Sequence, residues 1–289
     1  MPVMPDHGLM PPPPPNRLAL PQVTICAVSS TNVAATVRAL ETSLAQIAFA
    51  EAILFTHASP ANLLPGGRTD IRVVEIERLN SSAAYSEFLL AQLASHVRTS
   101  HCLIVQWDGH VIDAARWRPK FLDYDYIGAR WPQFGDGRDV GNGGFSLRSR
   151  RLMAACGASG FKAHHPEDLS ICRTNRAFLE DHGMRFAPGE LADEFAAERA
   201  GDPASSFGYH GVFLMPRVLG ADIFWEVYRT LDERSSLKPD FANLVKAVRT
   251  RPFTIWRSVK MISTRLSDAL RRVVRKSQAS SPFCLRNIP

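Results

Sequence analysis

The stretch His101-Cys-Leu-Ile-Val-Gln-Trp-Asp-Gly-His110 decides how this chain is expected to fold. Its first part is an uninterrupted apolar run, which is typical of a buried strand. An aspartate and a glycine follow directly, at the point where the strand would end. Because ligands of open α/β sheets bind beyond the carboxyl ends of the strands, we expect the chemistry of this protein just after Gln106.

Strand-like and helix-like segments alternate before this stretch. Short apolar runs predict strands, and longer runs with apolar residues at helical spacing predict helices. The predicted strands are 23–28, 52–56 and 71–76, and the predicted helices are 33–48 and 82–97. This alternation predicts βαβ crossovers, and therefore a Rossmann-type, mainly parallel sheet with helices on both faces. After Asp113 the chain becomes rich in Trp, Tyr, Gly and Asp, as expected of long loops that carry a site.

The composition is that of an ordinary globular protein. The chain has 289 residues, of which 45% are hydrophobic and 21% are charged. It contains no run of 18 uncharged apolar residues and begins with no secretory signal pattern, so we expect a cytoplasmic protein. The 5 cysteines are scattered without a C-x-x-C spacing, which favours buried, reduced thiols over a disulfide framework or a zinc site.

The two ends of the chain differ from its centre. Residues 1–21 include five consecutive prolines, Pro11–Pro15, and are expected to form a poorly ordered leader. We expect one α/β domain over residues 22–220 and a basic helical extension over residues 221–289.

The extension carries most of the positive charge. Residues 235–289 contain 12 Lys or Arg against 2 Asp or Glu, a charge of +10, which leaves −4 for residues 1–234 of a chain at +6. From Ile255 to Val274, apolar residues recur at helical spacing between basic ones, the pattern of a basic amphipathic helix. Three interpretations stay open: a terminal helix packed on the domain, attachment to an anionic membrane surface, or nucleic acid. The last lacks interleaved aromatic residues, so we expect no nucleic-acid partner.

Two segments near the expected site offer ligands for a phosphorylated substrate. Asp108 supplies a carboxylate that either binds a divalent cation on a diphosphate or caps the following turn. The segment Gly141-Asn-Gly-Gly144 presents backbone that a ligand can approach, or is an ordinary glycine-rich turn. It matches neither G-x-G-x-x-G nor the Walker pattern, which argues against dehydrogenases and P-loop enzymes.

Two further segments carry titratable groups. Glu167 and Asp168 follow Pro166, where acidic residues favour the start of a helix predicted over 169–179, although a carboxylate there is also placed to act as a general base. His210 lies between glycines in Gly208-Tyr-His-Gly211, so its imidazole has little steric cover. A lone histidine is more often structural than a ligand.

Taken in order, these segments resemble the acidic motif, glycine-rich loop, x-E-D motif and C-terminal histidine of nucleotide-sugar glycosyltransferases with the GT-A fold. More closely, the chain resembles a bacterial family described only as a domain of unknown function, itself similar to GT-A enzymes. The resemblance covers about residues 23–216. It rests on these segments: Gln106-Trp-Asp-Gly, Phe121-Leu-Asp-Tyr-Asp-Tyr-Ile-Gly128, Gly141-Asn-Gly-Gly-Phe-Ser-Leu-Arg-Ser-Arg150, His165-Pro-Glu-Asp168, Arg185-Phe-Ala-Pro188 and Phe207-Gly-Tyr-His-Gly211.

The resemblance implies a role for each matching residue. Asp108 and His210 would hold Mn²⁺ or Mg²⁺ on the donor diphosphate, and Asp168 would be the base of an inverting transfer. The residues implied in binding the donor and acceptor are Ala27, Ser29, Asn32, Arg78, Trp107, Asn142, Gly143, Gly144 and Glu167.

The function implied is transfer of a sugar from a nucleotide-diphosphate-sugar to a glycan or lipid-linked acceptor, in surface polysaccharide or lipopolysaccharide synthesis. The basic extension would hold the enzyme near its acceptor, at the inner face of the membrane. One departure puts the metal in doubt, because Gln106 replaces the first carboxylate of the usual D-x-D motif. It motivates an alternative, a catalytically inactive nucleotide-sugar or glycan-binding partner subunit. A third interpretation, an enzyme acting on phosphate esters or nucleic acid, rests only on the basic extension.

Overall fold

The computed structural model describes residues 17–59, 70–249 and 254–279. The proline run of the expected leader, Pro11–Pro15, lies outside these residues. The chain divides into two compact units. Unit 1 ends at Leu214 and also includes Thr230–Glu233, whereas unit 2 consists of Met215–Arg229 and the chain from Arg234 onward.

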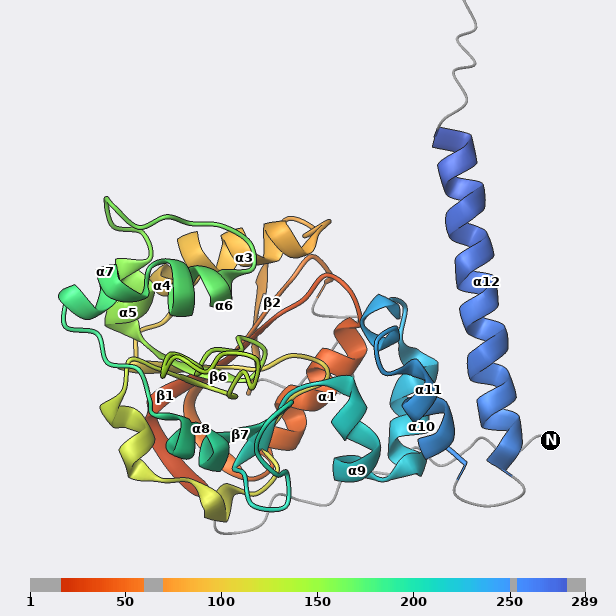
Figure 1. Cartoon of the computed structure of the whole chain (residues 1–289), viewed down its shortest axis with the longest axis horizontal. Coiled ribbons are helices and arrows are strands. Elements are labelled where there is room, and N and C mark those ends of the chain that lie inside the picture. The colour runs from red at the N-terminus through yellow and green to blue at the C-terminus, as the bar shows by residue number, and fades with distance from the viewer. Residues whose placement is uncertain (1–16, 60–69, 250–253, 280–289) are drawn as a thin grey trace, which may run out of the picture. The chain divides into compact units, whose positions relative to one another are not determined.

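Unit 1 is built around a mainly parallel sheet (Figure 1). Within the described residues six strands form this sheet in the order β3-β2-β1-β4-β6-β5. Their bounds are β1 Leu18–Val28, β2 Ile47–Thr56, β3 Arg72–Glu75, β4 His101–Ile104, β5 Tyr126–Gly128 and β6 Ser146–Ser149. Strands β3, β2, β1 and β4 run parallel to one another, whereas β6 runs antiparallel to both β4 and β5.

Short helices connect the strands and follow them. Those of unit 1 are α1 Val33–Leu44, α3 Ser82–Ala91, α4 Leu93–His96, α5 Arg150–Ala155, α6 Glu167–Leu169, α7 Arg176–Asp181 and α8 Gly189–Phe195, with the 3₁₀ turns η1 Ala114–Arg116, η2 Pro119–Asp123 and η4 Val212–Leu214. A π-helical turn, η3 Ser170–Thr174, separates α6 from α7. A second, two-stranded sheet pairs β7 Ala196–Ala197 with β8 Gly208–Tyr209 in parallel.

Both faces of the main sheet are buried at its centre, which explains why β4 and the later parts of β1 and β2 are apolar runs rather than alternating ones. In β1, the side chains of Ile25 and Ala27 pack in the cluster that contains residues of α1. The intervening Cys26 packs in the opposite cluster, with Phe88 of α3 and Leu93 of α4. Figure 1 shows α1 on one side of the sheet and α3 and α4 on the other. The prediction of an α/β fold with a mainly parallel sheet and helices on both faces is confirmed.

Several predicted boundaries are wrong. The helix predicted over 82–97 is two helices, because the chain leaves the helical path at Gln92 and becomes extended at Val97. The helix predicted over 169–179 is interrupted at Asn175, whose side-chain amide donates to the carbonyls of Ser170 and Lys162.

Unit 2 is helical. Its elements are α9 Met215–Leu219, α10 Ala221–Thr230, η5 Ser235–Leu237, α11 Phe241–Ala247 and α12 Ile255–Ala279. The predicted helix over the basic part of the chain is confirmed as α12. Among the helices of the described residues, none has the length and apolar character to span a bilayer.

Candidate functional site

The sheet contains one place where its connections change direction. From β1 the chain moves to β2 and β3 on one side, and it then crosses to β4 on the other side of β1. Such a switch point leaves a crevice outside the carboxyl ends of the two strands, and ligands of open α/β sheets bind there. Ser29 follows β1 at this edge, and Gln106 to Asp108 follow β4. The position expected for the chemistry is therefore at the switch point.

The antiparallel strand β6 brings the glycine-rich loop to the same edge. Ser146, the first residue of β6, pairs with Ile104, the last residue of β4. The loop that enters β6 must therefore lie at the carboxyl end of β4. Gly144 of this loop packs so closely on His210 that a Cβ at this position would overlap the imidazole ring.

Asp108 and His210, 102 positions apart in the sequence, lie in contact. Oδ1 of Asp108 is 3.5 Å from Nε2 of His210, and Oδ2 accepts a hydrogen bond from the backbone N–H of Val212 at 3.1 Å. Asp108 is buried, and its Oδ1 has no hydrogen-bond donor. A buried carboxylate oxygen without a hydrogen-bond donor costs free energy unless a positive charge lies nearby, and the nearest group that can carry one here is the His210 imidazole. This oxygen is a candidate metal ligand when that ring is neutral.

His210 lies between two carboxylates. Its Nδ1 is 3.2 Å from Oε1 of Glu198, and its Nε2 faces Asp108. Burial by itself lowers the pKa of this imidazole, but the negative charges of Asp108 and Glu198 outweigh burial and raise the pKa well above its ordinary value of 6.5. In this arrangement the ring is protonated and donates from both nitrogens.

Glu198 is a site residue that sequence reasoning missed. It follows the two-residue strand β7, whose Ala197 pairs with Tyr209, and this pairing sets Glu198 beside His210. Its Oε2 accepts a hydrogen bond from the side-chain amide of Asn142, and the Asn142 Oδ1 in turn accepts from the N–H of Gly144 at 3.1 Å. A strand of two residues has no periodicity that a sequence could reveal, so nothing marks Glu198 beforehand.

Gln106 connects this group to helix α3. Its Oε1 is 3.2 Å from Nε2 of His210, and its Nε2 donates to the hydroxyl of Tyr85 at 2.8 Å. Burial, and next the nearby charge of Glu167, raise the pKa of the Tyr85 hydroxyl far above its ordinary value, so it stays protonated. The glutamine that replaces the expected first carboxylate thus points an amide oxygen at His210.

Asp168 contacts the other glycine of the loop. Its Oδ2 accepts a hydrogen bond from the N–H of Gly143 at 3.2 Å, and its Oδ1 accepts from the N–H of Leu169 at 2.8 Å. Burial, followed by the neighbouring charge of Glu167, raises the pKa of the Asp168 carboxyl above 3.8. The adjacent glycines Gly143 and Gly144 therefore contact Asp168 and His210 respectively.

Glu167 is engaged in a buried ion pair. Its Oε1 accepts from the guanidinium of Arg148 at 3.1 Å, with 1% of the Arg148 side chain and 7% of the Glu167 side chain exposed. The Ser86 hydroxyl donates to Oε2 of Glu167 at 3.1 Å. A Cβ at Gly143 would overlap Glu167, so the ion pair of Arg148 and Glu167 packs directly against the glycine-rich loop. Arg148 was not assigned a role from the sequence.

The residues expected around the nucleotide lie at the ends of β1 and β3. Ala27 is fully buried in the core of β1, and Trp107 is half-buried beside Asp108. The Ser30 hydroxyl accepts from the N–H of Leu79 at 2.9 Å, which holds the segment of exposed Arg78 next to the turn that contains Ser29.

Asn32 is bound to a distant segment of unit 1. It adopts a left-handed conformation with φ 53°, which asparagine tolerates better than most residues. Its Oδ1 accepts from the N–H groups of Asp232 and Glu233 at 3.0 Å each, and its Nδ2 donates to the Glu233 carbonyl at 2.9 Å. The side chain of Asn32 is thus occupied by structural hydrogen bonds.

The donor set near Asp108 fits a divalent cation of limited ligand count. Over the described residues, no group of three or more His, Cys, Asp and Glu side chains is placed to hold a metal ion. The unpaired Oδ1 of Asp108, Nε2 of His210 and Oε1 of Gln106 nevertheless lie together. Mn²⁺ and Mg²⁺ accept such a set when substrate phosphates and water complete their shell. His210 must release its proton to join it.

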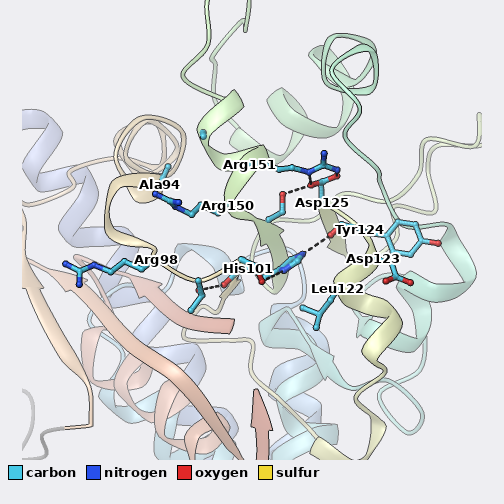
Figure 2. A pocket seen from close by; sticks show the side chains of 13 residues that line it. Ala94, Arg98, His101, Leu122, Asp123, Tyr124, Asp125, Arg150 and Arg151 are labelled. Carbon is cyan, nitrogen blue, oxygen red and sulfur yellow. Dashed lines mark hydrogen bonds and ion pairs between the residues drawn. The ribbon is translucent and has the colours of Figure 1, made fainter. Parts of the chain in front are cut away.

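A cavity of about 670 Å³ lies at the other end of the strands, away from the switch point (Figure 2). It surrounds the amino end of β4 at His101, and its lining includes none of the predicted site residues. Two of its polar side chains have partners in the lining: Arg151 donates to Asp125, and His101 Nε2 is 3.3 Å from the Tyr124 backbone carbonyl. Although burial raises it, the pKa of Asp125 is lowered overall by hydrogen bonds from Arg151, Ser149 and the Arg185 N–H.

Gly144→Ala tests the contact between the loop and His210. The added methyl group would overlap the imidazole, so it is expected to displace His210 from Asp108 and to weaken binding of a nucleotide in the presence of Mn²⁺ by at least about tenfold. Titration calorimetry measures this. Gly135→Ala is the matched control, because nothing lies within 4 Å of a Cβ there. Equal affinities for both variants would show that the loop does not position His210.

These features define an α/β protein with a cluster of polar and charged side chains at the switch point of its sheet. Residues 68–210 match the model of a family described as "Protein of unknown function (DUF5672)". No curated protein matches the chain.

Two solved structures are similar to the chain. One is a mannosyltransferase, PcManGT from Pyrobaculum calidifontis, in complex with GDP-Man and Mn²⁺, with 13% identity, a TM-score of 0.41, and coverage of 94% of this chain and 84% of that chain. The other is a glycosyltransferase involved in the glycosylation of the major capsid of PBCV-1, with 11% identity, a TM-score of 0.41, and coverage of 72% of this chain and 98% of that chain.

Proposed function

We propose that this chain is a glycosyltransferase that moves a sugar from a nucleoside-diphosphate sugar to a glycan or lipid-linked acceptor. The observation that carries the proposal is the pair Gly143–Gly144, which contacts Asp168 through one residue and His210 through the other. Glycines allow a sugar to approach the backbone closely. The proposed base and the proposed diphosphate-binding group are thus held against two adjacent glycines. Transfer from a diphosphate requires these two groups to lie close together.

Asp168 is the proposed general base of an inverting transfer. Its carboxylate takes the proton of the acceptor hydroxyl, whose oxygen forms a bond to the anomeric carbon. The bond from that carbon to the diphosphate oxygen breaks, and the nucleoside diphosphate leaves with the bonding electrons. A base works best when its pKa approaches the working pH, and burial moves the pKa of Asp168 in that direction.

Gln106, Asp108 and His210 are the residues that would hold Mn²⁺ or Mg²⁺. The cation would supply positive charge against the negative charge that develops on the departing diphosphate. Glu198 and Asn142 orient His210 and the Gly144 backbone through their hydrogen bonds. The chain's own contribution is thus a fixed arrangement of these groups before substrate binds.

The nucleotide is proposed to bind at the end of β1. Ser29 lies at the switch point, and the Ser30–Leu79 hydrogen bond keeps the backbone next to Arg78 beside this turn. The exposed guanidinium of Arg78 would pair with a phosphate. Asn32 would contribute only through the shape of its turn, because its side chain, its backbone N–H and its carbonyl are all engaged in hydrogen bonds within the protein. Trp107 and Glu167 belong to the proposed acceptor side, Glu167 through its support of the loop.

The proposed acceptor belongs to surface polysaccharide or lipopolysaccharide synthesis, an assignment that rests on the resemblance of the motifs. The cytoplasmic location expected from the sequence and the absence of a nucleic-acid partner stay part of this proposal. A catalytically inactive nucleotide-sugar or glycan-binding subunit is the second candidate. The observation that favours it is Gln106, which leaves Asp108 as the single carboxylate of its motif.

A nucleotide panel tests the donor site. UDP or GDP at about one hundred times its Kd, with Mn²⁺, is expected to stabilise the protein by about 2.7 kcal/mol, which raises the melting temperature by a few degrees. Asp108→Asn is expected to remove the part of this shift that depends on Mn²⁺. If neither nucleotide changes the melting temperature, the donor site is wrong. Turnover of UDP- and GDP-sugars then separates the two candidates, because the inactive subunit binds the nucleotide and releases no sugar.

A further inference from the structure

Helix α12 packs within unit 2 through one face. Met261 is fully buried on this face, and the Ser258 hydroxyl donates to the Val245 carbonyl at 2.8 Å. Farther along, the guanidinium of Arg265 lies 4.3 Å from the ring centre of Phe241 in α11. Residues 258, 261 and 265 recur at spacings of three and four, so they form one continuous stripe along the helix.

A second stripe of α12 is apolar and exposed. Its members recur at spacings of three or four and are large aliphatic residues, with exposed fractions between 47% and 68%. We name this surface the α12 stripe; its members are Ile255, Val259, Ile262, Leu266 and Leu270. Trp256, 53% exposed, adjoins its first turn. Single exposed apolar residues are ordinary, whereas a contiguous row of five marks a surface that binds something.

The charge around the α12 stripe is almost entirely positive. From Ile255 to the end of the chain Asp268 is the only acidic residue, and it pairs with Arg234 at 3.5 Å. Lys260 and Arg271 project from the other side of the helix, roughly 120–140° from the stripe at 100° per residue. Long basic side chains in this position reach back to a negatively charged plane that the apolar stripe enters.

We infer that the α12 stripe inserts into the interface of a bilayer that contains anionic lipids. A second copy of the chain is the main competing occupant, since the stripe has a spacing that a helix pair could use. Pairing two copies would bring together two helices with far more basic than acidic residues, which opposes association. An anionic bilayer supplies an apolar interior for the α12 stripe and negative charge for the basic residues. Each basic residue near such a surface raises the binding constant by about tenfold or less. This inference does not depend on glycosyl transfer.

Vesicle binding by the full chain tests the inference. The protein is expected to sediment with phosphatidylcholine vesicles that contain phosphatidylglycerol, and much less with phosphatidylcholine alone. The variant Val259→Ser, Ile262→Ser and Leu266→Ser changes only exposed residues, so it should stay folded. It is expected to lose at least about 100-fold in partitioning, since burial of each large apolar side chain contributes roughly a factor of ten or more.

Two further arms distinguish the alternatives. The double variant Lys260→Gln, Arg271→Gln keeps the apolar residues of the α12 stripe. It is expected to weaken binding to anionic vesicles by roughly tenfold or more. Light scattering measures the mass in solution. Equal vesicle binding by the wild-type and triple-serine proteins would overturn the inference, and so would a wild-type dimer that the triple-serine variant abolishes. The nucleotide-dependent melting shift is recorded for the same variants, so failure of the donor site is seen separately.

Discussion

Asp168→Asn is expected to lower kcat for the proposed sugar transfer by about 10²–10⁴-fold, because the substitution removes the carboxylate proposed as the general base. The affinity for the nucleoside diphosphate should stay within about threefold, since Asp168 contacts Gly143 and Leu169 rather than Asp108 or His210. Steady-state kinetics with a donor that turns over measures the first quantity, and calorimetry measures the second. An unchanged kcat would contradict the assignment of the base.

The pH dependence gives an independent readout of the same group. A base acts when deprotonated, so the wild-type rate should fall as the pH drops through the pKa of Asp168, which lies above 3.8. Asp168→Asn should lack this acidic decline. Asp181→Asn is the matched control, because Asp181 lies exposed at the end of α7. It should retain both the rate and the pH profile.

Arg148→Met is expected to lower the free energy of unfolding by about 3–5 kcal/mol, because it leaves the buried carboxylate of Glu167 without its cation. The Ser86 hydroxyl alone cannot replace the charge. Denaturation by urea measures the change. The loss should also displace Gly143, whose carbonyl faces Arg148, so transfer activity is expected to fall with stability.

Two variants set the scale for this prediction. Arg72→Met removes an exposed ion pair with Glu51, and it should cost at most about 1 kcal/mol. The double variant Arg148→Met, Glu167→Met removes both buried charges and should recover much of the stability lost in Arg148→Met. A double variant as unstable as the single one would mean that packing, not charge, determines the effect.

The alternation of apolar runs with helical segments is sufficient to predict the class of fold, because the central strands of a sheet covered on both faces are largely apolar. It did not predict that β6 runs antiparallel, since the apolar pattern of a strand carries no direction. The antiparallel course of β6 follows from its pairing with β4 and β5. Likewise, the break between α6 and α7 depends on the hydrogen bonds of Asn175, which periodicity does not register.

Only the site residues that belong to sequence motifs are predictable from the sequence. Asp108, the glycine pair and His210 were chosen from their order along the chain, and the structure brings them together. Glu198 and Tyr85 were not chosen, because each reaches the site through tertiary contacts between ordinary-looking segments. Four of the five cysteines lie within the described residues, and all four are buried and free, as expected: Cys26, Cys102, Cys156 and Cys172.

The hydrogen bonds between Asn32 and Asp232–Glu233 have a consequence for dissecting the protein. Residues 230–233 belong to unit 1, although the chain on either side of them belongs to unit 2. No single cut therefore separates unit 1 from all of unit 2. Truncation after Glu233 keeps the hydrogen bonds of Asn32 together with Met215–Arg229, whereas truncation at residue 220 leaves the Asn32 side chain without its partners and loosens the turn after β1. The shortest fragment that keeps unit 1 whole should thus end near residue 234.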